Sequence, residues 1–193
     1  MDNLQTTRLL IRPFTLNDLE AVHALLDLDL EWSGPQVSLE QRREKLRFQI
    51  SLAQWAVTGG IYGDRAIILK EKNLLIGVCG FRPWICSPAE RAGYRLPEIH
   101  NHPGHSLELG VGYALSSQHR GQGYASEAVK ALVEYGFSQL HLQRIVALTE
   151  RGNLGSVKVM QRAGMRVGLN PDPEATYPWA IGVIENINHD QTT

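Results

Sequence analysis

One segment of the sequence combines glycines and polar side chains in a spacing that can hold an anion. It follows an apolar run over 107–115, precedes a helix-like pattern that extends to about Gly136, and consists of Gln118, His119, Arg120, Gly121, Gln122, Gly123, Tyr124 and Ala125. Two glycines one residue apart at a strand-to-helix turn let several N–H groups point toward an anion at the helix N-terminus. Because glycines at such junctions are often only turn residues, the elements around them matter. We predict a pyrophosphate cradle here.

A second group of residues has the side chains of a metal site. Glu98, His100, His102 and His105 provide three imidazoles and a carboxylate, which suffice to bind a metal. The Pro103-Gly104 pair, however, favours a turn that breaks the alternation needed to bring these side chains together. We interpret the group as solvated histidines in a loop and predict no metal site.

The apolar patterns in the rest of the chain predict the elements that must position the cradle. Period-2 and continuous apolar runs indicate strands, and recurrences at three and four residues indicate helices. A Thr15–Asp18 capping box and Gly164, as a left-handed cap, mark two helix ends. We expect strands over 8–12, 65–69, 74–79, 107–115, 144–149, 165–168 and about 177–184, and helices over 15–28, 38–57, 124–136 and 156–163.

The order of these elements predicts an alternating α/β protein with antiparallel hairpins. Residues 81–106 carry four prolines and no clear period, so we expect an extended loop there, of a length that is usually functional or mobile. At 193 residues the chain is expected to form a single domain over 1–193, with this loop as an insertion.

Composition excludes several classes of partner. The chain has 19 Lys and Arg against 20 Asp and Glu, a net charge of −1, so it lacks the field that recruits nucleic acid or anionic membrane. No apolar stretch reaches the length of a membrane span, and the first residues lack the pattern of a signal peptide. Cys79 and Cys86 are expected to be packed thiols. We therefore expect a cytoplasmic protein.

Two motifs at the right spacing resemble those of the GNAT superfamily of acetyl-CoA-dependent N-acetyltransferases. The phosphate motif of that family is matched by Gln118, Gly121 and Gly123. A second signature is matched over 149–165, with Asn153, Ser156, Val159 and Gly164 in the corresponding places. The opening segment 7–14, Thr-Arg-Leu-Leu-Ile-Arg-Pro-Phe, resembles the branch that includes the ribosomal-protein alanine N-acetyltransferases.

The resemblance implies a fold and a cofactor site. The fold is a mixed, mostly antiparallel central sheet, splayed in the middle and flanked by about four helices. Acetyl-CoA would lie in the opening, where its pantetheine amides complete unpaired strand groups. Gly110-Val111-Gly112 would be a bulge or a close approach of another backbone. Residues 118–125 would bind the cofactor, with the amides of 118–123 holding the diphosphate. Asn153 would bind the pantetheine arm, and backbone N–H groups around Val111 to Tyr113 would stabilise the oxyanion.

The resemblance also suggests the catalytic residues. Glu108 lies on the strand that leads to the cradle and is the candidate base, but the branch usually places its acid three residues before the tyrosine, which here is Gly110. A bridging water would then be needed, and His100, His102 or His105 could substitute. The alternative for Glu108 is a salt bridge. Ser156 is a candidate proton donor to the thiolate or, alternatively, a helix N-cap.

The acceptor is a primary amine, on a small molecule or a protein N-terminus. Trp32 and Trp84 are expected in loops where this family builds its acceptor site, although tryptophans are commonly packing residues. Neither cysteine matches a catalytic position, which favours direct attack. Two alternatives stay open: a CoA-binding regulatory or sensing module without turnover, and transfer of a longer acyl group. A homodimer is compatible with the sequence.

Overall fold

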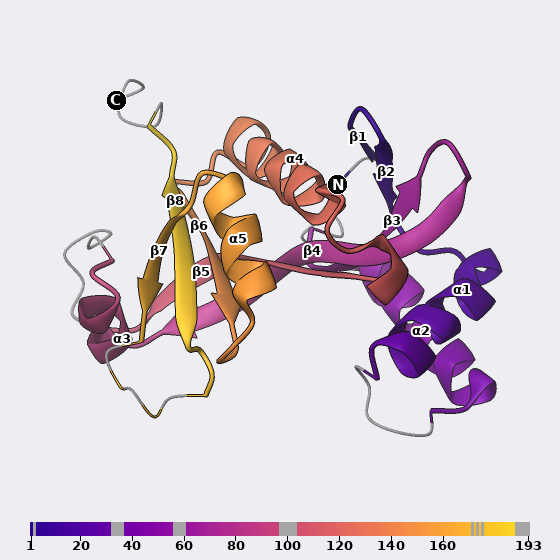
Figure 1. Cartoon of the computed structure of the whole chain (residues 1–193), viewed down its shortest axis with the longest axis horizontal. Helices are drawn as coiled ribbons and strands as arrows, with labels where there is room; N and C mark the ends of the chain where they lie inside the picture. Colours follow the sequence, from indigo (N-terminus) through magenta and orange to yellow (C-terminus); the bar gives the residue numbers. More distant parts are fainter. Residues whose placement is uncertain are drawn as a thin grey trace. The chain divides into compact units, whose positions relative to one another are not determined.

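The computed structural model places the strands in a mixed, mostly antiparallel sheet of eight, in the order β1-β2-β3-β4-β5-β6-β8-β7 (Figure 1). It describes residues 1, 3–31, 37–55, 61–96, 104–170, 172, 174 and 176–187. The strands are β1 (Leu4–Gln5), β2 (Leu9–Arg12), β3 (Gly63–Leu69), β4 (Leu74–Cys86), β5 (Ser106–Leu115), β6 (Arg144–Thr149), β7 (Arg166–Leu169) and β8 (Ala180–Glu185).

Five α-helices lie within the described residues, which confirms the α/β class and adds one helix to the expected number. They are α1 (Leu19–His23), α2 (Leu39–Trp55), α3 (Pro88–Gly93), α4 (Tyr124–Ser138) and α5 (Leu154–Arg162), joined by the 3-10 turns η1 (Leu16–Asp18) and η3 (Ser117–His119) and the π-helix η2 (Ala24–Asp29). The chain divides into two compact units, Met1–Phe81 with Tyr113–Ala131, and Arg82–Gly112 with Leu132–Thr193.

The first unit is built on the predicted hairpin. β3 and β4 pair antiparallel, with Leu69 opposite Leu74, and β2 adds to the other side of β3. β1, which the sequence analysis did not predict, pairs with β2. The core contains Phe14, Val22, Leu25, Leu46 and Val78, so the helices α1, η2 and α2 bury their apolar stripes against these strands.

The predicted first helix has a different form from the expected one. The Asp18 carboxylate accepts hydrogen bonds from the Thr15 amide at 2.7 Å and the Thr15 hydroxyl at 3.0 Å, so the cap is where the sequence placed it. The α-helix ends at His23, and the following residues, up to Asp29, form a π-helix. Apolar spacing does not distinguish these forms, because both keep a buried stripe.

The second unit has β6 at its centre. β6 pairs with β5 in parallel, at Gly110 and Val146, and with β8 antiparallel. β7 lies at the edge, paired antiparallel with β8. Its core contains Cys86, Tyr94, Leu96, Val146 and Ile181. Gly164 follows α5 with a φ of +87°, which confirms the left-handed cap.

The expectation of an extended loop over 81–106 is wrong for the described part of that range. β4 continues through its proline to Cys86, and α3 follows directly. The cause of α3 is a capping box, in which the Ser87 hydroxyl accepts from the Glu90 amide at 3.2 Å and the Ser87 amide donates to the Glu90 carboxylate at 2.8 Å. Residues 97–103, including His100 and His102, lie outside the described residues.

Candidate functional site

The glycine-rich segment forms the predicted turn between β5 and α4. β5 ends at Leu115, η3 covers Ser117–His119, and α4 begins at Tyr124 (Figure 1). Gly121 has a φ of +77° and Gly123 a φ of +84°, values that an L side chain adopts at a cost. A Cβ atom on Gly121 would meet nothing within 4 Å. The two glycines are therefore required by the turn, and the space beside Gly121 is open.

The turn carries a set of amide groups without protein partners. Among the hydrogen bonds that the described residues form, none uses the backbone N–H of Gly121, Gln122, Gly123 or Tyr124. The first amides of a helix have no acceptor within the helix, and the helix dipole adds partial positive charge at this end. These donors, with the open space at Gly121, suit a phosphate group.

Hydrogen bonds from side chains of the first unit stabilise the turn. The Asp29 carboxylate accepts from the Ser117 amide at 2.8 Å, and the Gln122 side chain donates to the Gln118 carbonyl at 3.4 Å. The hydrogen bonds from Ser117 lower the pKa of Asp29, so this carboxylate stays charged at neutral pH. Arg120 donates to the Leu115 carbonyl at 3.3 Å. The turn is thus fixed on the side of β5.

Two polar atoms at the turn are buried without a hydrogen-bond partner among the described residues. They are Nδ1 of His119 and the hydroxyl of Ser126, the latter in a residue only 8% exposed on the first turn of α4. Buried polar groups are costly to leave unsatisfied, and a bound water molecule or ligand satisfies such groups. Sequence reasoning included His119 but missed Ser126, whose only signal is a polar residue on an otherwise apolar helix face.

Asn153 and Ser156 lie at the start of α5, as the second motif requires. The Asn153 side chain caps the helix by accepting from the Ser156 amide at 3.0 Å, and it donates to Glu150 at 3.0 Å. The prediction that Ser156 is the N-cap is therefore wrong, because the cap lies three residues earlier. Ser156 is half-buried and stands at the third helical position.

Glu108 forms a salt bridge, which was the alternative to its predicted role as the base. Arg144 of β6 donates to both carboxylate oxygens, at 2.9 and 2.6 Å, and the Ser106 hydroxyl donates to one of them at 2.8 Å. Both charged side chains are 3% exposed. Each oxygen of Glu108 is already engaged, so proton transfer from a substrate would have to displace one of these bonds.

The glycines of β5 are explained by a close approach of β4. A Cβ atom on Gly110 would lie 3.2 Å from the Arg82 carbonyl oxygen, and one on Gly112 would lie 2.7 Å from the Arg82 side chain. Of the two expectations for this segment, the close approach of another backbone is the one observed at Gly110. Val111 between them is buried, and Tyr113 is half-buried.

Of the two tryptophans predicted to contact the acceptor, only Trp84 lies within the described residues. Trp84 lies in β4 and not in the expected loop, and it packs half-buried against the core around Cys86 and Tyr94. This is the packing interpretation, and it explains the side chain without a ligand. Trp32 lies outside the described residues.

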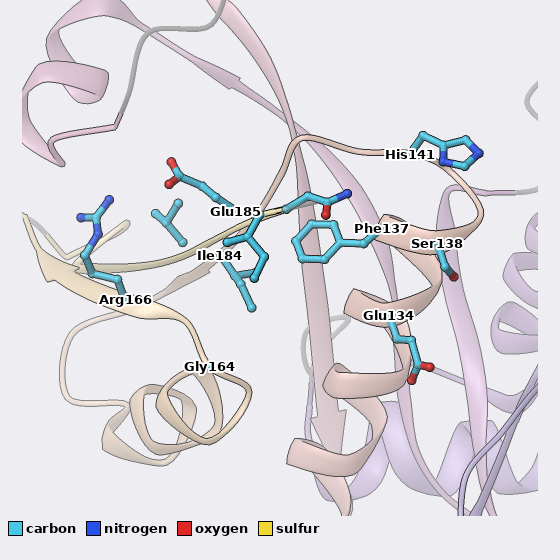
Figure 2. A pocket seen from close by; sticks show the side chains of 11 residues that line it. Glu134, Phe137, Ser138, His141, Gly164, Arg166, Ile184 and Glu185 are labelled. Atoms are coloured by element: carbon cyan, nitrogen blue, oxygen red, sulfur yellow. The ribbon is translucent and has the colours of Figure 1, made fainter. Parts of the chain in front are cut away.

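One cavity among the described residues is lined by none of the predicted site residues. It has a volume of about 1120 Å³ and lies between the end of α4 and the strands β7 and β8. Figure 2 shows Phe137, His141, Ile184 and Glu185 around it. A second cavity of about 270 Å³, lined by Phe14, Ile50 and Tyr62 among others, lies between α2 and β3.

None of the helices in the described part of the chain is both long and apolar enough to cross a membrane. The same described residues contain no group of three or more His, Cys, Asp and Glu side chains arranged to hold a metal ion.

The Acetyltransferase (GNAT) domain family matches residues 8–166. The "Uncharacterized N-acetyltransferase p20" of Bacillus licheniformis is 31% identical over 170 residues, which cover 83% of this chain and 80% of that protein.

Solved structures share the fold. A GNAT-family acetyltransferase from Bacillus anthracis has a TM-score of 0.67 at 23% identity, covering 95% of this chain and 98% of the other. RimL, a ribosomal L7/L12 α-N-protein acetyltransferase solved with coenzyme A, has a TM-score of 0.68 at 20% identity, covering 95% and 97%.

Proposed function

The chain belongs to the GNAT family of N-acetyltransferases and is an acyltransferase, and from this premise we propose that it moves an acetyl group from acetyl-CoA to a primary amine. The observation that carries the proposal is the turn at Gly121 and Gly123, with its open space and its set of amides that bind no protein group. We also propose that 1–193 is one domain, which the family match across both compact units supports.

The residues of the turn fit a diphosphate. Residues 118–125 would bind it through the backbone amides of 121–124, with His119 and Ser126 offering the two unsatisfied buried atoms nearby in the chain. Asn153 would bind the pantetheine arm, and backbone N–H groups near Val111 to Tyr113 would stabilise the oxyanion. Ser156 would donate a proton to the departing thiolate. When bound, acetyl-CoA supplies the activated acetyl group, while this chain orients it and excludes water.

The burial and the raised pKa of both cysteines support direct attack by the amine, without an acyl-enzyme. Cys79 and Cys86 are buried. Burial raises the pKa of Cys79 far above its usual range and the pKa of Cys86 to about 11, with Glu90 as the next cause at Cys86. Because the thiolate is the nucleophile, neither side chain suits a covalent step at neutral pH. We also propose a cytoplasmic location, which two free thiols support.

For the acceptor we propose a primary amine on a protein N-terminus or on a small molecule. The N-terminal acceptor is supported by the shared fold of RimL, a ribosomal L7/L12 α-N-protein acetyltransferase. Trp84 stays a proposed acceptor contact because it is only partly buried, and Trp32 stays a prediction from the sequence. A homodimer is proposed on the exposed apolar side chains of α2, Phe48 and Leu52.

One observation favours a second candidate function. Glu108 is the carboxylate of β5, and Arg144 and Ser106 occupy it. A CoA-binding sensing module without turnover needs no base and would keep the turn intact. The role of Glu108 as the base therefore stays a proposal, to be decided by experiment, as does transfer of an acyl group longer than acetyl.

The test is release of free CoA from acetyl-CoA with a panel of amines. The panel includes peptides with N-terminal Ser or Ala, the same peptides with blocked N-termini, polyamines and amino acids. We expect release with at least one free amine and none with its blocked form. Tight CoA binding without release for any acceptor would favour the sensing module. Absence of CoA binding would contradict the proposal itself.

A further inference from the structure

Arg8, immediately before β2, contacts the turn between β5 and α4, although the two are more than a hundred residues apart in the sequence. Its Nη1 donates to the Gln122 carbonyl at 3.0 Å, and its Nε and Nη2 bind one oxygen of Glu127 at 2.7 and 2.6 Å. The guanidinium also lies over the ring of Tyr124, 4.4 Å from its centroid. One side chain therefore contacts the turn, the first residue of α4 and the carboxylate of its first turn.

We propose that Arg8 is the positioning residue of the diphosphate turn, which it holds in its binding conformation while neutralising Glu127. This inference rests on the proposed function, because it assumes that the turn binds the diphosphate of CoA. It adds a residue that lies outside both sequence motifs and that need not touch the ligand.

The contact with Gln122 orients a binding amide. In a trans peptide the carbonyl of one residue and the N–H of the next point in opposite directions. The Gln122 carbonyl points at Arg8, so the N–H of Gly123 points away from it, and among the described residues it has no acceptor. The hydrogen bond from Arg8 thus fixes the direction of one of the amides that the diphosphate would use.

The contact with Glu127 removes an electrostatic conflict. A carboxylate in the first turn of α4 stabilises the helix dipole, but it repels an anion bound at the same end. Arg8 compensates this charge at hydrogen-bond distance. The second oxygen of Glu127 accepts from the Thr6 hydroxyl at 2.5 Å and from the Arg8 amide at 2.9 Å. The Glu127 side chain is therefore fixed in one rotamer, and both of its carboxylate oxygens are paired.

The charged state of Glu127 follows from the same contacts. Burial raises the pKa of Glu127, but hydrogen bonds from Thr6 and Arg8 outweigh it, so the pKa lies below its usual value. At neutral pH the carboxylate is ionised in the free protein. Loss of Arg8 alone would leave this negative charge beside the diphosphate, whereas loss of both would leave the turn neutral but without its tether to Gln122.

The experiment is a double-mutant cycle with CoA as the probe, measured by titration calorimetry from 50 to 500 mM NaCl. The variants are Arg8→Met, Glu127→Gln, the double variant and Arg8→Lys. Arg8→Lys keeps the positive charge but lacks the planar guanidinium, which binds several acceptors at once. The matched control is Arg43→Met, because Arg43 pairs with Glu40 on α2 and its side chain is similarly exposed, 40% against 43% for Arg8. Thermal unfolding of every variant is recorded alongside.

We expect Arg8→Met to raise the Kd for CoA about 10- to 100-fold and to reduce the salt dependence of binding. The double variant should recover part of the affinity but not all of it, Arg8→Lys should be intermediate, and Arg43→Met should bind like the wild type. A folded Arg8→Met variant with wild-type affinity and salt dependence would overturn the inference alone. Equal loss in the single and double variants would overturn the charge argument. Wild-type protein that binds no CoA would overturn the proposed function as well.

Discussion

Glu108 of β5 and Arg144 of β6 form a bidentate ion pair in which both side chains are 3% exposed. The two residues are 36 positions apart in the sequence, and each would be an uncompensated buried charge without the other. The pair therefore joins two neighbouring strands of the second unit and engages the carboxylate that the sequence offered as a base.

Loss of either charge should destabilise the protein more than it impairs chemistry. We expect Glu108→Gln and Arg144→Met each to lower the free energy of unfolding by about 3–5 kcal/mol, the usual cost of breaking a buried pair. The double variant Glu108→Leu with Arg144→Met should regain much of this, measured by urea unfolding. A kcat of this double variant within tenfold of the wild type would leave Glu108 with a structural role alone. A well-folded double variant whose kcat falls 100-fold or more would instead identify Glu108 as the base.

The glycine at the open side of the turn should not tolerate a side chain. Gly121→Ala adds a methyl group at a φ of +77° and in the space proposed for the diphosphate. We expect at least a tenfold higher Kd for CoA and a stability loss of about 1 kcal/mol. Gly164→Ala is the matched control, since Gly164 has a φ of +87° at the end of α5. It should lose similar stability and keep the wild-type Kd; a tenfold weaker Kd in both variants would refute the assignment.

Substitutions of the two polar residues at the start of α5 should affect different measurements. Asn153→Ala should change stability, and Ser156→Ala should change kcat. Asn153→Ala removes the N-cap and should cost about 1 kcal/mol of stability. Ser156→Ala leaves the N-cap intact, because the cap uses the Ser156 amide and not its hydroxyl, so it should cost less stability than Asn153→Ala. If Ser156 donates the proton, kcat should fall at least tenfold at nearly constant KM. An unchanged kcat in Ser156→Ala would remove this residue from the catalytic proposal.

Acid should destabilise the protein through its paired carboxylates. Burial raises the pKa of Asp27, but hydrogen bonds from Arg42 and His23 outweigh it, and the pKa of Asp27 lies below its usual value. A lowered folded-state pKa contributes stability that is present above the unfolded value, about 3.9, and is lost as the pH falls below it. Urea unfolding between pH 7 and pH 3 should show this decline.

Asp27→Asn tests the assignment of the acid effect to this carboxylate. The variant should be less stable at pH 7 and should lose less additional stability on acidification than the wild type. Glu44→Gln, an exposed position on α2, serves as the control and should retain the wild-type decline. Equal declines in Asp27→Asn and in the wild type would place the effect elsewhere.

Local signals predicted much of the fold. The glycine pair at 121 and 123 and the Thr15–Asp18 cap specify short-range geometry, and both are present in the structure. α3 was missed because six residues are too few for a period, although its Ser87–Glu90 capping box is visible in the sequence. The π-helical form of Ala24–Asp29 was missed because its apolar stripe resembles that of an α-helix.

The contacts of the site could not be predicted in the same way. The Glu108–Arg144 pair and the Arg8–Glu127 pair join residues 36 and 119 positions apart, and no local pattern specifies which charges meet across strands. Asn153 rather than Ser156 caps α5 because the helix begins two residues earlier than its apolar spacing indicated. Such an error is within the usual uncertainty of a helix boundary, but it exchanges the roles of two polar residues.

A crystal structure with CoA at saturating concentration tests the central claim most directly. The account predicts that phosphate oxygens lie within hydrogen-bond distance of the amides of Gly121, Gln122 and Gly123, with the Arg8–Gln122 contact retained. CoA phosphates bound at another surface, with these amides left to solvent, would contradict it.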